Sequence, residues 1–172
     1  ERLAARGVAF KFGVPCARLD PQLPTVIATG APAAARLLAI DAPEVAAALA
    51  RVQMLPLATA TVFFRPSLDD THGFGVLFPR ESGMDALGVL FNTDIFPGRA
   101  TCRSETWIYG STRTTADVVF LSRDRVLADR ERVTSRRDEP LDVVMTSWPE
   151  AVPCYDTAIT HAEPALARLP AT

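Results

Sequence analysis

The sequence of 172 residues is poor in the residues that metal and catalytic sites use most. It contains two histidines, His72 and His161, and three cysteines that are far apart and form no C-x-x-C pair. This spacing predicts neither a zinc site nor a disulfide framework. His72 falls in a polar loop and His161 in an expected surface helix, so we interpret both as solvent-facing and assign no catalytic residue. Reduced thiols favour a cytoplasmic location.

Long apolar runs and a charge excess of one sign are also absent. No apolar run reaches about 18 residues, so no transmembrane segment is expected. The net charge is −2. Acidic residues alternate with Arg123, Arg125, Arg130 and Arg132, which we expect largely on the solvated face of a helix. We therefore expect no nucleic-acid partner. A hydrophobic content of 48% with 22% charged residues is typical of a globular chain that can bury a sizeable core.

Neither of the common phosphate-binding glycine motifs occurs in the chain. There is no G-x-G-x-x-G and no G-x-x-x-x-G-K-[ST]. The Gly73-Phe74-Gly75 sequence lacks a third glycine and does not lead into a helix. The sequence thus contains no dinucleotide fingerprint.

The stretch around which the chain is organised is Gly73–Arg99. Two apolar segments, Phe74–Phe78 and Ala86–Phe91, flank turn residues and read as strands. The β-rich Leu57–Arg65 is a third strand, which we expect to form an antiparallel hairpin with Gly73–Arg80.

The remaining pattern predicts an α+β fold, a mixed and mainly antiparallel sheet with helices packed on one face. Further strands are expected at Val8–Val14, Thr25–Thr29, Cys102–Tyr109 and Leu141–Trp148. Helices are expected at Ala33–Ile40, from a cap at Asp41 to about Val52, from a cap at Thr114 or Thr115 through Val133, and from Asp156 to Pro170.

Two motifs resemble a known family. GFGVLFPR at residues 73–80, followed by LGVLFN and FPGRA, resembles the substrate-domain sheet of protoporphyrinogen-oxidase-like flavoproteins, within the flavin-dependent amine oxidase superfamily. SWPEAVPCYD at Ser147–Asp156 resembles that group's W-x-x-A-[IV]-P-x-Y motif. The resemblance covers the chain from Leu3 onward, as the latter part of a longer family member.

The resemblance implies a division of the chain by role. Residues 1–55 would contain the return strands and helix at the FAD-domain side, and residues 56–172 a portion of the substrate-binding domain. The chain would be a fragment of an FAD-dependent oxidoreductase that oxidises an apolar substrate by hydride transfer to flavin. A porphyrinogen and an amine are the two substrate classes, and the motif favours the porphyrinogen.

The resemblance also implies site residues. Trp148 would lie by the isoalloxazine ring, and Cys16 would stand where the family has a valine whose backbone meets the adenine end. The alternatives are a core or turn-anchoring tryptophan and a small buried cysteine. The substrate pocket would include Phe74, Phe78, Phe91 and Tyr155, for which core packing is the alternative.

A second hypothesis comes from a different class of protein. The chain could be a non-catalytic ligand-binding or protein-interaction module, and the missing cofactor motifs support it. An apolar face without a cofactor domain to cover it would favour a homodimer.

We expect the purified 172-residue chain to be colourless. The family holds the FAD pyrophosphate with glycine-rich motifs, and the sequence lacks them, so FAD belongs to the parent protein and none should be bound to this chain. The absorbance spectrum checks this. Stoichiometric FAD that co-purifies with the chain alone would contradict it.

Overall fold

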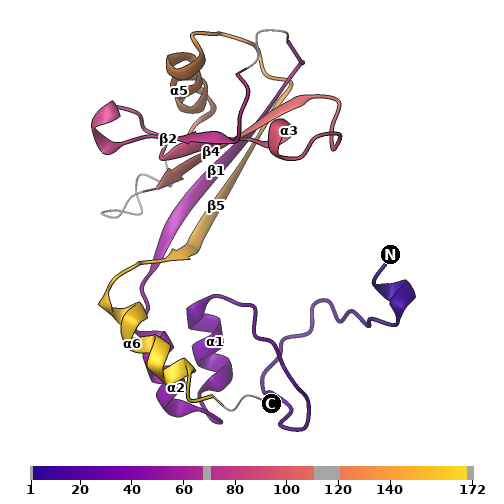
Figure 1. Ribbon diagram of the computed structural model, residues 1–172, viewed down its shortest axis with the longest axis vertical. Coiled ribbons are helices and arrows are strands. Elements are labelled where there is room, and N and C mark those ends of the chain that lie inside the picture. Colours follow the sequence, from indigo (N-terminus) through magenta and orange to yellow (C-terminus); the bar gives the residue numbers. More distant parts are fainter. Residues whose placement is uncertain (1, 68–70, 111–120, 170–172) are drawn as a thin grey trace. The chain divides into compact units, whose positions relative to one another are not determined.

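The computed structural model describes residues 2–67, 71–110 and 121–169, arranged in two compact units (Figure 1). The sheet unit is Met54–Cys154, and the helical unit combines Glu1–Gln53 with Tyr155–Thr172. The sheet unit contains a five-stranded sheet whose pairs are all antiparallel. The predicted α+β class is confirmed. The division by role at residue 55 stays a prediction, because the two units reflect packing alone.

The sheet has the strand order β2-β3-β4-β1-β5. Its strands are β1 (Met54–Phe64), β2 (Gly75–Leu77), β3 (Gly88–Phe91), β4 (Arg103–Gly110) and β5 (Asp142–Pro153). Five of the predicted strands therefore lie in one sheet.

The predicted hairpin of Leu57–Arg65 with Gly73–Arg80 is wrong. β1 pairs with β4 and β5, whereas β2 pairs with β3 at the sheet edge. The reason is length and burial. From Ala58 onward β1 carries a buried apolar side chain at every second position. It pairs with β4 from Leu57 opposite Gly110 to Phe64 opposite Arg103. The three-residue β2 offers too few partners for such a central strand.

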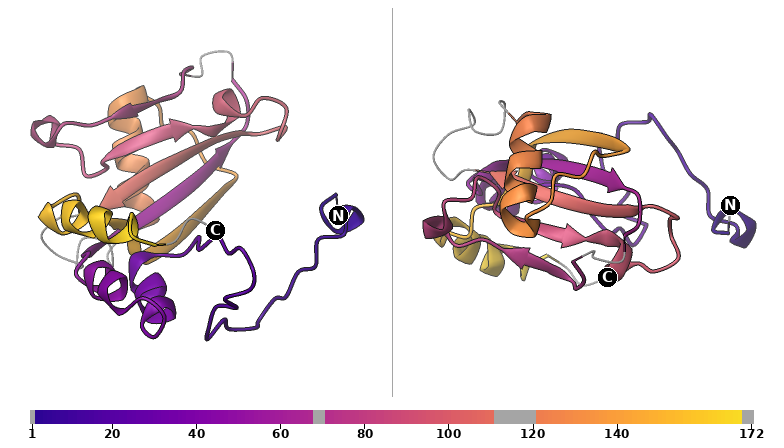
Figure 2. Two further views of the ribbon diagram at one scale, coloured as in Figure 1. Left: turned by 60° about the horizontal axis from the view of Figure 1, so that its bottom comes forward. Right: turned by 90° about the horizontal axis from the view of Figure 1, so that it is seen from above.

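One face of the sheet forms the main core, and helix α5 (Arg123–Thr134) lies across it (Figures 1 and 2). Strands alternate their side chains between two faces, so every second residue of β1 and β4 points to this core. Its buried members are Ala58, Ala60, Val62, Phe64, Ala86, Val89, Phe91, Trp107, Tyr109 and Val126.

Helix α5 differs from the prediction in its start and in its buried side. The proposed caps Thr114 and Thr115 lie outside the described residues. The helix begins after Ser122, whose hydroxyl accepts from the Arg125 N–H at 3.3 Å. Arg130 was expected on the solvated face, but it is only 3% exposed. Arg130 follows the buried Val126 by four residues, so it lies on the same side of the helix.

β5 runs past the predicted end at Trp148 to Pro153. The pairing of β1 and β5 shifts register between Leu55 and Leu57, just beyond the partner of Trp148. Pro56 and Pro149 lie at this point, and neither has a backbone N–H to donate, which is why the ladder is interrupted there. Trp148 therefore precedes a bulge inside a strand and does not stand at a strand end.

The helical unit contains α1 (Ala31–Leu38), α2 (Pro43–Ala50) and α6 (Thr157–Leu166). Short side chains of α1 and α2 pack together in a small second core. The helix predicted from Asp41 is present, but Ala42 is its N-cap and Asp41 instead pairs with Arg18 at 3.3 Å. None of the helices in the described residues is long and apolar enough to span a bilayer.

The strands predicted at Val8–Val14 and Thr25–Thr29 are wrong. The first segment turns at Gly13, whose φ of +67° is in the left-handed region, and the second carries no strand hydrogen bonds. Alternating apolar residues favour a strand only when a neighbouring strand supplies hydrogen bonds. The helical unit has no sheet in its described part, so these segments have no such neighbour.

We expect Gly88→Ala to destabilise the sheet unit. A Cβ at this position would meet the carbonyl oxygen of Val76 at 2.7 Å, so β2 would have to move away from β3. Overpacking of this kind costs about 1–3 kcal/mol of the free energy of unfolding. Urea denaturation measures the change, and an unchanged midpoint would show that β2 is only loosely paired with β3.

Candidate functional site: the open face of the sheet

The face of the sheet opposite α5, here called the open face, is lined by apolar and hydroxyl side chains. The strand registers assign it Leu57, Thr59, Thr61, Phe63, Leu77, Leu90, Thr106, Ile108, Asp142, Val144, Thr146 and Trp148. These side chains are partly or largely exposed, whereas those on the α5 face are mostly buried. Asp142, at the start of β5, is the one ionisable side chain in this set. Over its central part the open face therefore offers apolar contact and hydrogen bonds but no acid or base.

Hydrogen bonds fix the polar side chains of the open face. The hydroxyls of Thr61 and Thr106 lie 3.0 Å apart across β1 and β4, and the Asn92 amide donates to Thr106 Oγ1 at 2.8 Å. The Trp148 indole N–H donates to Thr59 Oγ1 at 3.1 Å. A rotatable threonine and a half-exposed tryptophan are thereby held in one orientation each, as a preorganised binding surface requires.

A hollow opens at one end of this face, where helix α3 (Asn92–Ile95) and the loop that follows it border the sheet. Its volume is about 340 Å³, within the range usual for small-molecule sites. The lining consists of Thr61, Phe63, Asn92, Thr93, Phe96, Arg99, Ala100 and Ser104. The hollow thus combines two aromatic rings with a small set of polar groups and one cation.

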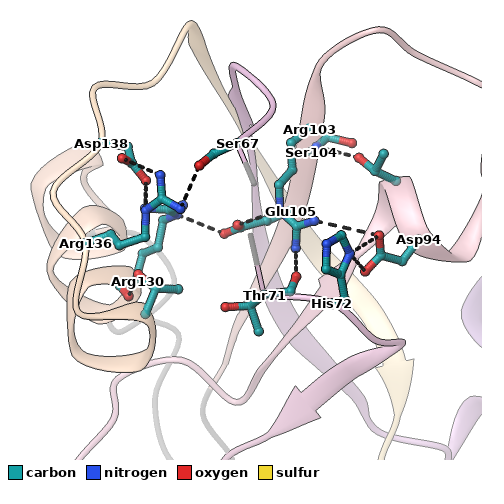
Figure 3. A network of polar contacts seen from close by, with 12 residues as sticks. Ser67, Thr71, His72, Asp94, Arg103, Ser104, Glu105, Arg130, Arg136 and Asp138 are labelled. Carbon is teal, nitrogen blue, oxygen red and sulfur yellow. Dashed lines mark hydrogen bonds and ion pairs between the residues drawn. The ribbon is translucent and has the colours of Figure 1, made fainter. Parts of the chain in front are cut away.

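A network of charges is buried on the other face of the same strands, and Figure 3 shows it from close by. Its centre is Glu105 of β4, which is 1% exposed. Arg103 Nε lies 3.5 Å from Glu105 Oε1, and Arg130 Nε lies 3.2 Å from Oε2, which also accepts from the Trp107 indole at 3.2 Å. The carboxylate therefore faces two guanidinium groups, one from the sheet and one from α5.

Each of these two arginines also lies over an aromatic ring. The guanidinium carbon of Arg130 is 3.8 Å from the centre of the Phe64 ring, and that of Arg103 is 5.3 Å from the centre of the Phe91 ring. Arginine suits this role because its flat, weakly hydrated guanidinium can stack and form ion pairs at once.

The network reaches the surface at both ends. Arg103 contacts the Thr71 carbonyl and approaches Asp94 of α3 at 3.7 Å, and Asp94 also accepts from the Gly73 N–H at 2.8 Å and lies 3.2 Å from His72 Nδ1. At the other end Arg130 and Arg136 both pair with Asp138, at 3.1 and 2.9 Å. The chain of charges thus ties α5, β4, α3 and the segment before β2 together.

The surroundings of these carboxylates shift their pKa values. Partial burial raises the pKa of Asp94, but the Gly73 N–H, His72 and the Arg103 charge outweigh it, so the pKa lies below its ordinary value. Burial likewise raises the pKa of Asp138, but Arg136 and Arg130 lower it overall. Both groups are therefore charged at neutral pH and keep the network ionic.

The structure places Trp148, the predicted flavin neighbour, on the open face with 50% of its surface exposed. Phe78 and Phe91 lie in the main core, where Phe78 stacks on Trp107 at 6.0 Å between ring centres. Phe91 is 2% exposed, and a pocket role for it stays a prediction that its burial does not favour. Phe74 is exposed.

Cys16 and Tyr155 belong to the helical unit. Both are exposed, and the Cys16 thiol lies 3.4 Å from the Arg18 carbonyl oxygen. Their predicted contacts with FAD and with substrate stay predictions. Among the described residues there is no cluster of three or more His, Cys, Asp or Glu side chains that could hold a metal ion.

The sequence analysis missed the polar residues of the hollow and the buried network. Asn92, Thr93 and Arg99 lie in the loop region after the second predicted strand, and nothing in their spacing marks them. Glu105 did carry a signal, because it is a charged residue at an inward-facing position of a strand that also contains Trp107 and Tyr109.

Over 167 residues the chain is 26% identical to the chloroplastic protoporphyrinogen oxidase of Oryza sativa subsp. japonica, a match that covers 87% of this chain and 31% of the rice protein. The chain is protoporphyrinogen-oxidase-like. The resemblance recognised in its motifs is thereby confirmed.

A solved structure supports the fold of this protoporphyrinogen-oxidase-like chain. A crystal structure from Exiguobacterium sp. 255-15, named after protoporphyrinogen oxidase, aligns with a TM-score of 0.54 at 21% identity, covering 83% of this chain and 33% of that one. At this identity the match shows the fold alone. No family model matches the sequence. The chain spans about a third of the length of both proteins.

We expect Glu105→Ala to destabilise the sheet unit strongly. The substitution leaves Arg103 and Arg130 buried without the carboxylate that both face, and breaking a buried ion pair typically costs about 3–5 kcal/mol. Urea denaturation measures the free energy of unfolding. Glu150→Ala is the control, since Glu150 is exposed and its removal should change stability by less than about 0.5 kcal/mol. Equal effects of the two substitutions would contradict a central role for Glu105.

Proposed function

We propose that this chain supplies the substrate-binding sheet of an FAD-dependent oxidoreductase that oxidises an apolar substrate by hydride transfer to the flavin. The observation that carries the proposal is the open face, whose central side chains are apolar or carry hydroxyls, with the ionisable Asp142 only at the start of β5. The similarity in sequence to a protoporphyrinogen oxidase supports it.

The chemistry of the open face fits this reaction class. FAD would supply the hydride acceptor, and the protein is then left to bind the substrate, orient it and exclude water. Phe63, Leu90 and Ile108 provide apolar contact, while the hydroxyls of Thr61 and Thr106 provide hydrogen bonds. A site built for hydrolysis or acyl transfer would need a nucleophile or a base at this surface.

Trp148 is the residue that we assign to the flavin side. Its half-exposed indole is held by Thr59, so a flat aromatic face is presented in a fixed orientation. A flat ring system such as isoalloxazine is a suitable partner for such a face. The rest of the FAD would be held by parts of the parent protein that carry the glycine-rich motifs.

A porphyrinogen fits the open face better than an amine. An amine is a cation at neutral pH, and the hollow carries a positive arginine and no carboxylate in its lining. Like charges would oppose the entry of an ammonium group. The name of the rice relative agrees with the porphyrinogen.

The alternative is a non-catalytic ligand-binding module, favoured by the absence of both glycine motifs from the chain. The two proposals differ in the natural polypeptide that contains these 172 residues. That polypeptide should show the absorbance of bound flavin, and protoporphyrinogen should bleach it without oxygen. A flavin-free parent protein would support the module instead.

A pair of tryptophan variants tests the role of Trp148 in that parent protein. Trp148→Ala should lower flavin content or turnover more than it lowers the melting temperature, because half of its surface is already exposed. Trp107→Ala is the matched control. Trp107 is fully buried in the core, so its truncation should cost about 3–5 kcal/mol of stability. Full flavin content and normal turnover in Trp148→Ala, with a strongly lowered melting temperature, would leave Trp148 a structural role only.

A further inference from the structure

Arg99 differs from the seven described arginines of the sheet unit that pair with a carboxylate. The arginines that pair with a carboxylate are Arg103, Arg123, Arg125, Arg130, Arg132, Arg136 and Arg137. Arg99 has no carboxylate partner among the described residues, and its guanidinium carbon instead lies 4.9 Å from the centre of the Phe96 ring. The stacking restrains the guanidinium, while its N–H groups stay available at the hollow that Arg99 lines.

The neighbours of Arg99 in the hollow add hydrogen-bond donors to its charge. Thr93 Oγ1 accepts from the Ser104 N–H at 2.8 Å, and its own hydrogen remains free to donate. The Asn92 amide and the Thr61 hydroxyl stand beside it in the lining. No carboxylate belongs to this lining. Asp142, which is opposite Phe63 on the neighbouring strand, is not one of the lining residues.

We propose that the hollow is a carboxylate subsite, in which Arg99 forms the ion pair with an acid group carried by an apolar ligand. The rings of Phe63 and Phe96 contact the apolar body, and the Thr93 hydroxyl donates to the carboxylate. The guanidinium fork matches a carboxylate with two parallel hydrogen bonds. In identifying the ligand with the substrate, the inference rests on the proposed function. The subsite itself rests only on the hollow.

The composition of the hollow favours a carboxylate over a phosphate. A phosphate carries up to two charges and is usually bound by clustered bases or by backbone N–H groups at the start of a helix of some length. The hollow has one arginine, and α3 is only four residues long. One cation beside two aromatic rings instead suits a single negative charge on an apolar molecule.

The experiment compares two probes that differ only in charge, 1-pyrenebutyrate and 1-pyrenebutanol, with the 172-residue chain. Fluorescence titration gives both dissociation constants. The carboxylate should bind about fivefold or more tightly than the alcohol at low salt. The preference should shrink at high salt, because the pair is accessible to solvent. In NMR spectra of labelled protein, the carboxylate should shift the amide signals of Thr93, Phe96 and Ala100.

Two variants locate the charge that is responsible. Arg99→Gln should abolish the preference and leave the affinity for 1-pyrenebutanol unchanged, which also shows that the hollow is intact. Arg65→Gln removes the same charge outside the lining and should keep the preference. Equal affinities of the two probes, or equal loss in both variants, would overturn the proposal. A preference that depends on Arg99 in a chain whose parent binds no flavin would support the subsite while contradicting the proposed function.

Discussion

The carboxylate of Glu105 is placed where water cannot reach it, and the sheet unit depends on how its charge is balanced. An unpaired charge at this depth would cost several kcal/mol or more, so the fold requires both arginines that face it. Arg103 comes from the same strand, 3.5 Å away, and Arg130 comes from α5, 3.2 Å away. The pairing of Glu105 with Arg130 therefore specifies how α5 lies on the sheet, which apolar contacts alone would leave less well defined.

The same network acts on the open face, although none of its charges lies there. Arg103 extends to Asp94, which belongs to the short helix α3 and also accepts a hydrogen bond from the Gly73 N–H. Asn92 and Thr93 of that helix line the hollow. A four-residue helix has little stability of its own, so its position depends on these contacts and on the bond from Asn92 to Thr106. Buried charges on one face thus support the hollow on the other.

The sequence was informative wherever a local pattern decides the structure. The β-rich run at Leu57–Arg65 and the apolar run at Ala86–Phe91 are strands, and the two family motifs led to the right relatives. Strand pairing was not predictable in the same way, because β1 pairs with β4 between residues that are 39 to 53 positions apart in the chain. The sequence pattern predicted Arg130 on the solvated face of its helix. Its burial follows from Glu105, which is 25 residues earlier in the chain.

The buried charged side chains of β4 lie on the α5 face of the sheet, and its neutral hydroxyls lie on the open face. An ionisable group on a surface that is covered by cofactor and substrate would lose its hydration, and its charge would then be costly. Strand β4 avoids this by placing Arg103 and Glu105 toward α5, while Ser104 and Thr106, which alternate with them, point to the open face. Neutral hydroxyls can direct a substrate by hydrogen bonds and still let the site become dry. A reaction in which the cofactor carries the electrons needs the protein to provide this combination.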